Sequence, residues 1–428
     1  MTRQSWISSA NDPVTDFPLT HLPYGAFKVA GGQHLCVAIG SFLVDLYRCA
    51  QSGLLPKALI DPCCQPVLNP LMSLGSASWM LLRETLTDLL RQDASPQVQK
   101  AVETALHPLK EAVLLNSVAI PNYTDFYASI HHARRVGELF RPDQPLLPNY
   151  KYVPIAYHGR ASSIIISKTA IIRPRGQVRP DIGKPPAFLP TNALDFELEL
   201  AFYVGQSNPL GSPISIDQAQ QYLFGLSLLN DWSARDIQAW EYQPLGPFLG
   251  KSFATTISPW ITPIAALASF RSPLSLRQGA DPPSLPYLTS AEDQKGGAFD
   301  ITLEAYLVTS AMRKQGIAPF QISQSNAKDL YWSAAQMITH HASNGCNLQV
   351  GDLLGTGTIS GPELSAAGCL LELTQNGKNP LLLPTGETRA FLQDEDEVIL
   401  RGSCVRSGYP RIGLGECCGK ITAPHASD

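Results

Sequence analysis

The stretch Asn230–Thr256, which reads NDWSARDIQAWEYQPLGPFLGKSFATT, is the part around which we interpret the rest of the chain. Asn230 or Asp231 is a suitable helix N-cap, since a short polar side chain can accept a hydrogen bond from the first turn. No Pro or Gly interrupts Trp232–Tyr242, so the sequence predicts a helix over these residues.

Polar side chains of four kinds would form one stripe on this helix, because they stand three or four residues apart. They are an acid, a cation, an amide and a phenol: Asp231, Arg235, Gln238 and Tyr242. A Pro- and Gly-rich turn follows and leads to Lys251. A solvated helix face would explain most such stripes. Here Trp232 and Trp240 flank the stripe, so we expect a packed helix whose polar groups have partners.

The composition excludes several classes of protein. A chain of 428 residues with 44% apolar composition can form one large domain or two ordinary ones. The net charge of −4, with dispersed Lys and Arg, does not indicate binding to nucleic acid or to an anionic membrane. No apolar run approaches the roughly 20 residues of a spanning helix. The 35 prolines and 32 glycines favour many short strands over a helical bundle.

The cysteines and the first residues indicate a cytoplasmic protein. The opening MTRQSWISSANDPV lacks the apolar core of a signal peptide. The nine cysteines are odd in number and form no CxxC pair. We therefore expect reduced thiols in the cytoplasm.

Residues 1–117 are expected to form a small structural or assembly domain. Phe27–Ala30 and Leu35–Ile39 are strand candidates around a Gly-Gly hairpin signal. Ser78 and Ser95 are expected to cap two helices. This region holds no cluster of catalytic residue types.

Residues 118–428 change in character and are expected to form the catalytic domain. The clearest strand candidates alternate apolar and polar residues or are short apolar runs: Ser163–Ser167, Phe299–Thr309, Leu370–Thr374 and Val398–Leu400. The chain as a whole is therefore predicted to be mainly β, in the α+β class.

Two glutamates in Asp195–Leu200, DFELEL, are a candidate metal site. On a strand Glu197 and Glu199 would point to one face, about 7 Å apart by the strand rise. At an effective dielectric near 20, two such charges repel by about 2 kcal/mol. A solvated face would relieve the repulsion and is the better interpretation of an isolated pair. A hard cation would also relieve it by recruiting more carboxylates, for which Asp231 is a candidate.

Two other segments carry chemical groups. Asn122–His132, NYTDFYASIHH, offers an acid, a phenol and a histidine pair, although a surface histidine is the simpler interpretation of such a pair. Tyr157–Ser163, YHGRASS, is a polar turn that enters an apolar strand.

Long, ordered motifs resemble one known family. They are YTDFY at 123–127, LPNY at 147–150, YHGRASS at 157–163, RPRGQ at 173–177, LDFELELAF at 194–202, NDWSARDIQAWEYQPLGPFLGKSF at 230–253, NGCNLQVGDLLGTGTISGPE at 344–363 and GYPRIGLGECCGK at 408–420. In these motifs, and in PYGAF at 23–27, the chain resembles the fumarylacetoacetate hydrolase family. Shorter hydrolases, decarboxylases and isomerases of the superfamily share the paired glutamates but generally lack the N-terminal domain.

The resemblance implies a fold and an activity. The fold would be a small SH3-like N-terminal barrel followed by a mixed β-sandwich roll, assembled as a homodimer. The activity would be hydrolysis of the carbon–carbon bond of 4-fumarylacetoacetate to fumarate and acetoacetate, the last step of tyrosine and phenylalanine breakdown. An acylpyruvate hydrolase or decarboxylase on the same scaffold, or a metal-binding relative without turnover, are the alternatives.

The resemblance also implies the site residues. The metal ligands, for calcium or magnesium, would be Asp125, Glu197, Glu199 and Asp231, with Lys251 and Thr255 near an additional magnesium position. The catalytic base would be His132, with Glu372 as its acidic partner and Arg235, Gln238 and Lys251 as stabilisers of negative charge. The neighbouring His131 is an alternative base. The substrate contacts would be Tyr127, Arg141, Tyr157, Gln238, Tyr242 and Thr358.

These residue types suit the chemistry of a β-diketone. Water must add to one ketone before a carbanion can leave, so a base such as His132, oriented by Glu372, is needed. The tetrahedral alkoxide needs fixed positive donors. A divalent cation can hold the diketone oxygens and the departing enolate.

Overall fold

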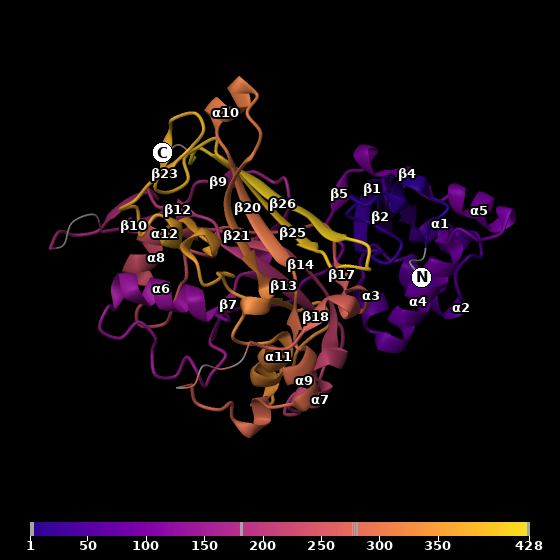
Figure 1. Cartoon of the computed structure of the whole chain (residues 1–428), viewed down its shortest axis with the longest axis horizontal. Coiled ribbons are helices and arrows are strands. Elements are labelled where there is room, and N and C mark those ends of the chain that lie inside the picture. The colour runs from indigo at the N-terminus through magenta and orange to yellow at the C-terminus, as the bar shows by residue number, and fades with distance from the viewer. Residues whose placement is uncertain (1–3, 180–182, 276, 278, 280, 426–428) are drawn as a thin grey trace.

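The computed structural model describes residues 4–179, 183–275, 277, 279 and 281–425. Within these ranges no helix has the length and apolar character needed to cross a membrane. Figure 1 shows an N-terminal lobe, in indigo and purple, beside a larger body that contains the rest of the chain.

The N-terminal lobe is a five-stranded antiparallel sheet with short helices around it. Its strands, in the order β4-β3-β2-β1-β5, are β1 (Tyr24–Val29), β2 (Gly32–Ile39), β3 (Phe42–Asp45), β4 (Leu106–Pro108) and β5 (Leu114–Leu115). Its helices are α1 (Leu46–Gln51), α2 (Lys57–Cys63), α3 (Asn69–Met72), α4 (Ser76–Leu90) and α5 (Pro96–Glu103). The predicted hairpin is confirmed, since Val29 pairs with Gly32 and Gly31 has a φ of 87°. Ser95 caps α5, but Ser78 lies inside α4, so its predicted role as a cap is wrong.

The larger body contains two mixed sheets that share one core. The strands of the first sheet follow the order β7-β6-β22-β13-β14-β16-β8, and β17 (Thr262–Pro263) pairs with β14. Their bounds are β6 (Tyr123–Phe126), β7 (Ala156–Gly159), β8 (Ile164–Ile166), β13 (Leu198–Val204), β14 (Leu223–Asp231), β16 (Thr255–Ile257) and β22 (Leu353–Gly355). The second, in the order β21-β20-β25-β26-β9, has β9 (Ile171–Ile172), β20 (Thr302–Val308), β21 (Phe320–Asn326), β25 (Glu397–Cys404) and β26 (Ile412–Thr422). Leu228 and Leu303, one from each sheet, belong to the same apolar cluster.

Short strand pairs and helices complete the body. The pairs are β10 (Arg175–Val178) with β11 (Ala187–Pro190), β12 (Leu194–Asp195) with β15 (Ser233–Ala234), β18 (Arg271–Ser272) with β19 (Ala298–Phe299), and β23 (Leu381–Leu382) with β24 (Thr388–Arg389). The helices are α6 (Ile130–Phe140), α7 (Ile216–Ala219), α8 (Arg235–Glu241), α9 (Ala291–Gly296), α10 (Ser310–Gln315), α11 (Ala334–Ala342) and α12 (Leu370–Leu373). The predicted mainly β, α+β fold, with a small β unit before a larger sheet region, is confirmed.

The N-terminal lobe packs on the side of the first sheet that faces away from the second. The ring of Tyr24 stacks on that of Phe224 of β14, with the ring centroids 5.3 Å apart. The ring of Trp79 of α4 contacts the Phe224 ring edge-on, with the centroids 5.1 Å apart. Tyr24 also forms a β-bridge with Ile261. The first sheet is therefore covered on both faces, which explains why β13 and β14 are buried along their whole length.

Two predicted elements differ in the structure. The helix predicted over Trp232–Tyr242 begins only at Arg235, because Asp231 ends β14 and pairs with Thr255 of β16. The predicted strand Leu370–Thr374 is instead the short helix α12. The carboxylate of Asp195 accepts hydrogen bonds from the backbone N–H groups of Leu370 and Leu371 and so caps this helix from a distant part of the chain.

Candidate functional site

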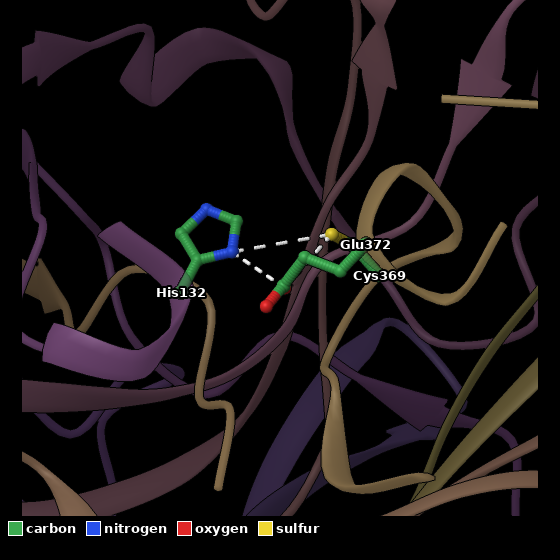
Figure 2. A group of neighbouring side chains, drawn as sticks. All are labelled: His132, Cys369 and Glu372. Atoms are coloured by element: carbon green, nitrogen blue, oxygen red, sulfur yellow. Dashed lines mark hydrogen bonds and ion pairs between the residues drawn. The ribbon is translucent and has the colours of Figure 1, made fainter. Parts of the chain in front are cut away.

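A buried histidine–glutamate pair connects α6 to α12. His132 stands in the first turn of α6, whose N-cap Ser129 accepts a hydrogen bond from the His132 backbone N–H. The His132 Nδ1 donates to Glu372 Oε2 at 2.6 Å. Figure 2 shows the second ring nitrogen, Nε2, on the side away from Glu372. The pair therefore fixes the proton on Nδ1 and leaves Nε2 able to accept one.

Glu372 is held as a carboxylate by several donors. Besides His132, its oxygens accept from Ser360 Oγ at 2.8 Å, Cys369 Sγ at 3.1 Å and Arg135 Nη1 at 3.2 Å. Burial alone would raise the pKa of Glu372, but the charge and hydrogen bond of His132 and the bonds from Cys369 and Ser360 outweigh it and lower the pKa to about 2. His131, in contrast, is half-buried, and burial and the nearby Arg135 lower its pKa. His132 is thus the member of the histidine pair that meets Glu372.

Four buried carboxylates from the strands of the first sheet and the residue before β13 lie close together. We call Asp125, Glu197, Glu199 and Asp231 the carboxylate cluster; each offers one oxygen, and these four oxygens lie within 4.8 Å of one another. Asp125 belongs to β6, Glu199 to β13 and Asp231 to the end of β14. Glu197 lies just before β13 rather than on the same strand as Glu199, yet both reach the cluster.

One half of the carboxylate cluster is neutralised by side-chain cations. Glu197 accepts from Arg235 Nη1 at 2.7 Å and from Lys251 Nζ at 2.5 Å, and Lys251 lies 3.1 Å from Asp231 Oδ2. Burial would raise the pKa of Glu197, but Lys251 and Arg235 outweigh it and lower that pKa below its ordinary value. Asp231 also accepts from Tyr157 Oη at 2.6 Å and Thr255 Oγ1 at 2.9 Å.

The other half of the cluster, Asp125 and Glu199, forms no ion pair with a cation among the described residues. Asp125 Oδ1 and Glu199 Oε2 share the backbone N–H of Gly357, at 3.1 and 3.0 Å. Glu199 Oε1 is buried and has no hydrogen-bond partner among the described residues. Burial and mutual repulsion with neighbouring carboxylates raise the pKa values of both Asp125 and Glu199 well above their ordinary range.

A hard divalent cation fits this arrangement. The ligand set consists of oxygens only, which is what Ca²⁺ and Mg²⁺ prefer. The unpartnered oxygen of Glu199 and the raised pKa values show a deficit of positive charge that such an ion would fill.

A cavity of about 180 Å³ opens onto the carboxylate cluster, lined by Tyr123, Tyr157, Asp231, Lys251 and Thr255 among others. Of the predicted substrate contacts, Tyr157 lies on this cavity. Lys251 and Thr255, predicted near an additional magnesium position, also line it. These residues therefore present hydroxyl and ammonium groups to a molecule entering the site.

The other predicted substrate contacts are not among the residues that line this cavity. Tyr127 packs edge-on against the His132 ring at 5.2 Å. Gln238 Oε1 accepts from Arg235 Nη1 at 3.4 Å, while Tyr242 is partly exposed after α8. Thr358 Oγ1 and Arg141 Nε are buried atoms without partners among the described residues. Each atom therefore has a hydrogen-bonding capacity that these residues do not use.

Sequence reasoning missed several residues that hold the site. Asp195 accepts from Arg235 Nε at 2.9 Å while it caps α12, so it connects a stabilising cation to the helix of Glu372. Ser360 and Cys369 reach Glu372 from distant parts of the chain, and no sequence pattern indicated them. Tyr123 could have been found, because it alternates with Asp125 on one strand and so faces the same side.

The fold and the site define a class: an enzyme built on mixed sheets that carries a buried histidine–glutamate pair and an oxygen-only ligand set suited to a hard metal ion. Comparisons agree. The fumarylacetoacetase N-terminal family matches residues 20–115, and the fumarylacetoacetate (FAA) hydrolase C-terminal family matches residues 122–422. The chain therefore belongs to the fumarylacetoacetate hydrolase family.

Curated relatives and a solved structure support this. A fumarylacetoacetase of Arabidopsis thaliana is 46% identical over 98% of this chain and 98% of its own length. A fumarylacetoacetase of Homo sapiens is 45% identical over 97% of this chain and 98% of its own length. The solved fumarylacetoacetate hydrolase of Exiguobacterium antarcticum aligns with a TM-score of 0.52 at 16% identity, covering 94% of this chain and 99% of that one, and shows a shared fold.

Proposed function

We propose that the protein hydrolyses the carbon–carbon bond of 4-fumarylacetoacetate to fumarate and acetoacetate, the last step of tyrosine and phenylalanine catabolism. The observation that carries the proposal is the buried His132–Glu372 pair, bonded at 2.6 Å, in a chain that also holds the carboxylate cluster. The curated relatives named fumarylacetoacetase match nearly the whole chain, including the N-terminal lobe.

His132 acts as the general base in this proposal. Its Nε2 takes a proton from water, and the resulting hydroxide adds to one ketone carbon of the diketone. Glu372 keeps the proton on Nδ1 and stabilises the imidazolium that forms. The carbon–carbon bond then breaks, and the electron pair leaves with the acetoacetate carbon, which takes up a proton.

Arg235, Gln238 and Lys251 stabilise the negative charge that develops on oxygen. Arg235 and Lys251 are buried and already fixed by Glu197, so they need little reorganisation when the charge appears. Burial would lower the pKa of Lys251, but Asp231 and Glu197 outweigh it and raise that pKa, so the ammonium stays charged.

We propose that the carboxylate cluster holds Ca²⁺ or Mg²⁺, with Lys251 and Thr255 close to an additional magnesium position. When bound, the cation supplies a Lewis acid for the diketone oxygens. The oxygen-only donor set and the unpartnered Glu199 Oε1 support this.

We propose Tyr127, Arg141, Tyr157, Gln238, Tyr242 and Thr358 as substrate contacts. The unpartnered buried atoms of Arg141 and Thr358 support their part in this set, because a buried donor without a bond is costly unless a ligand satisfies it.

The proposal also covers the domain organisation, the oligomeric state and the location of the protein. Residues 1–117 would form the structural or assembly domain and residues 118–428 the catalytic domain, in a homodimer. We also propose a cytoplasmic location, since all nine cysteines are free thiols.

The test is to follow the ultraviolet absorbance of fumarylacetoacetate with the purified protein and magnesium while fumarate and acetoacetate are quantified. Loss of absorbance with equal amounts of both products is expected. Persistent absorbance with no fumarate would remove the proposal, and turnover of an acylpyruvate or a decarboxylation instead would assign a different keto acid to the scaffold. Adjacent histidines give a matched comparison: His132→Ala should lose activity and His131→Ala should keep most of it.

A further inference from the structure

Tyr123 carries a buried hydroxyl to which the reaction above gives no role. Its side chain is 3% exposed, and its Oη has no hydrogen-bond partner among the described residues. Leaving such a group unpaired costs free energy, whereas a phenylalanine of the same shape would avoid that cost. An orphaned hydroxyl next to an active site therefore indicates a partner that the chain itself does not supply.

The hydroxyl points into the carboxylate cluster. Tyr123 and Asp125 are two residues apart on β6, so both side chains lie on the same face of the sheet. A Cβ built on Gly355 of β22 would lie 3.2 Å from Tyr123 Oη, 2.5 Å from Asp125 Oδ1 and 3.1 Å from Glu199 Oε2. These oxygens thus surround one small volume, which stays open because residue 355 has no side chain.

The Tyr123 side chain also borders an open space next to the cluster. Tyr123 lines the 180 Å³ cavity together with Asp231 and Lys251. A small molecule or water that enters this cavity can reach both the carboxylates and Tyr123. Tyr123 therefore lies next to both the carboxylate cluster and the cavity from which a further ligand would come.

Coordination chemistry requires such further ligands. The carboxylate cluster offers one oxygen from each of four residues, whereas Mg²⁺ takes six oxygens and Ca²⁺ six to eight. At least two positions are left for oxygens that are not supplied by these four atoms. An oxygen bound to a cation is polarised, and it is held best when a fixed neighbour forms a hydrogen bond with it.

We propose that Tyr123 Oη donates a hydrogen bond to an oxygen ligand, a water in the resting enzyme, that the cation draws from the cavity into the carboxylate cluster. The inference rests on the proposed binding of a divalent cation. Tyr123 is thus a positioning residue for the ligand shell. The unpaired hydroxyl lowers the stability of the metal-free protein. The hydrogen bond that it forms when the cation is present restores that stability.

The test compares Tyr123→Phe with a matched control, Tyr203→Phe. Tyr203 is also a fully buried tyrosine of the first sheet, but its hydroxyl is bonded to Ser227 at 3.2 Å. Metal-free wild type and both variants are prepared by chelation. Calcium binding is then measured by titration calorimetry, and thermal unfolding is measured with and without calcium.

Opposite results are expected for the two variants. Tyr123→Phe should leave the Tm of the metal-free protein unchanged or higher, raise the calcium Kd about 3- to 10-fold, and reduce the rise in Tm that calcium causes. Tyr203→Phe should lower the metal-free Tm and leave the calcium Kd at the wild-type value.

Three other outcomes would overturn the inference, and each has a different cause. A wild-type calcium Kd in Tyr123→Phe shows that the hydroxyl does not serve the ligand shell, whatever the metal-free Tm. A lower metal-free Tm in this variant shows that the hydroxyl already has a partner in the protein. If the wild type itself binds neither calcium nor magnesium, the proposed cation site fails and the inference fails with it.

Discussion

The His132–Glu372 pair and the carboxylate cluster are both buried groups of ionisable side chains, and they differ in how far the chain alone satisfies them. Glu372 accepts from four side chains and keeps a pKa of about 2 despite its burial. Glu199 has one oxygen without a partner and a pKa raised well above its usual range. Two glutamates that look alike in sequence thus have opposite electrostatic environments.

The difference indicates which site is complete within the chain. The donors around Glu372 compensate the cost of burying its charge, so the acid–base pair is ready without any added group. The two cations near the carboxylate cluster, Arg235 and Lys251, form ion pairs with Glu197 and Asp231. Asp125 and Glu199 form no ion pair with a cation among the described residues, and their pKa values are raised although Lys251 lies near enough to lower them in part. We propose that a bound cation completes the cluster, whereas the pair needs no added ion.

Removal of the cation is expected to have the largest effect. Prolonged chelation should reduce turnover to the background rate, and magnesium or calcium should restore it, because the carboxylate cluster is not neutralised without a cation. Full activity in protein shown by elemental analysis to be metal-free would contradict this.

Glu372→Gln should lower kcat by about 10²- to 10⁴-fold, which is the usual contribution of a general base. The amide removes the charge that stabilises the imidazolium and can reverse the tautomer of His132. Calcium affinity should stay at the wild-type value, since Glu372 does not belong to the carboxylate cluster. A variant with wild-type kcat would show that the pair has only a structural role.

The pKa of Glu372 predicts how its contribution to stability varies with pH. The folded-state pKa of about 2 lies below the ordinary 4.5, so the stabilisation is present above pH 4.5 and is lost as the pH falls through about 2. The full contribution is about 3 kcal/mol at 1.36 kcal/mol per pKa unit. Urea unfolding of wild type and Glu372→Gln between pH 6 and pH 3 measures it. The difference in unfolding free energy should shrink as the pH falls; a difference independent of pH would refute the assignment.

Cys369→Ala should have the smallest effect. The thiol is one of four side-chain donors to Glu372 and a weak one, at 3.1 Å from Oε2. We expect kcat to fall by less than about tenfold, consistent with the loss of one hydrogen bond. Cys369→Ser keeps a donor at this position and should retain more of the rate than Cys369→Ala. Equal losses in both variants would show that the volume of the sulfur matters and its hydrogen bond does not.

The sequence predicted the fold class and two groups of side chains that the fold brings together, but it predicted the secondary structure of some of these segments wrongly. Alternation and turn signals located the β1–β2 hairpin, and the predicted strand Val398–Leu400 lies within β25 (Glu397–Cys404). The helix predicted from Trp232 was wrong at its start, because pairing of Asp231 with β16 is a long-range contact that outweighs a local N-cap preference.

Other features depended on contacts that are distant in sequence. α12 was predicted as a strand, since its cap, Asp195, lies 175 residues away from Leu370. The donors Ser360 and Cys369 are recognisable only once the fold brings them to Glu372. Glu197, Glu199 and Asp231 were candidates from the sequence pattern, but the pattern alone did not distinguish a metal site from a solvated pair. The choice of a metal site, and Asp125 as its fourth member, came from the resemblance.

The most direct test of the division between the two sites is to titrate Glu199→Gln and Glu372→Gln with magnesium while rate and bound metal are both measured. Glu199→Gln should bind magnesium about 10- to 100-fold more weakly and recover part of its rate at high magnesium. Glu372→Gln should bind magnesium like the wild type and stay slow at every concentration. Rescue of Glu372→Gln by magnesium, with no rescue of Glu199→Gln, would contradict the account.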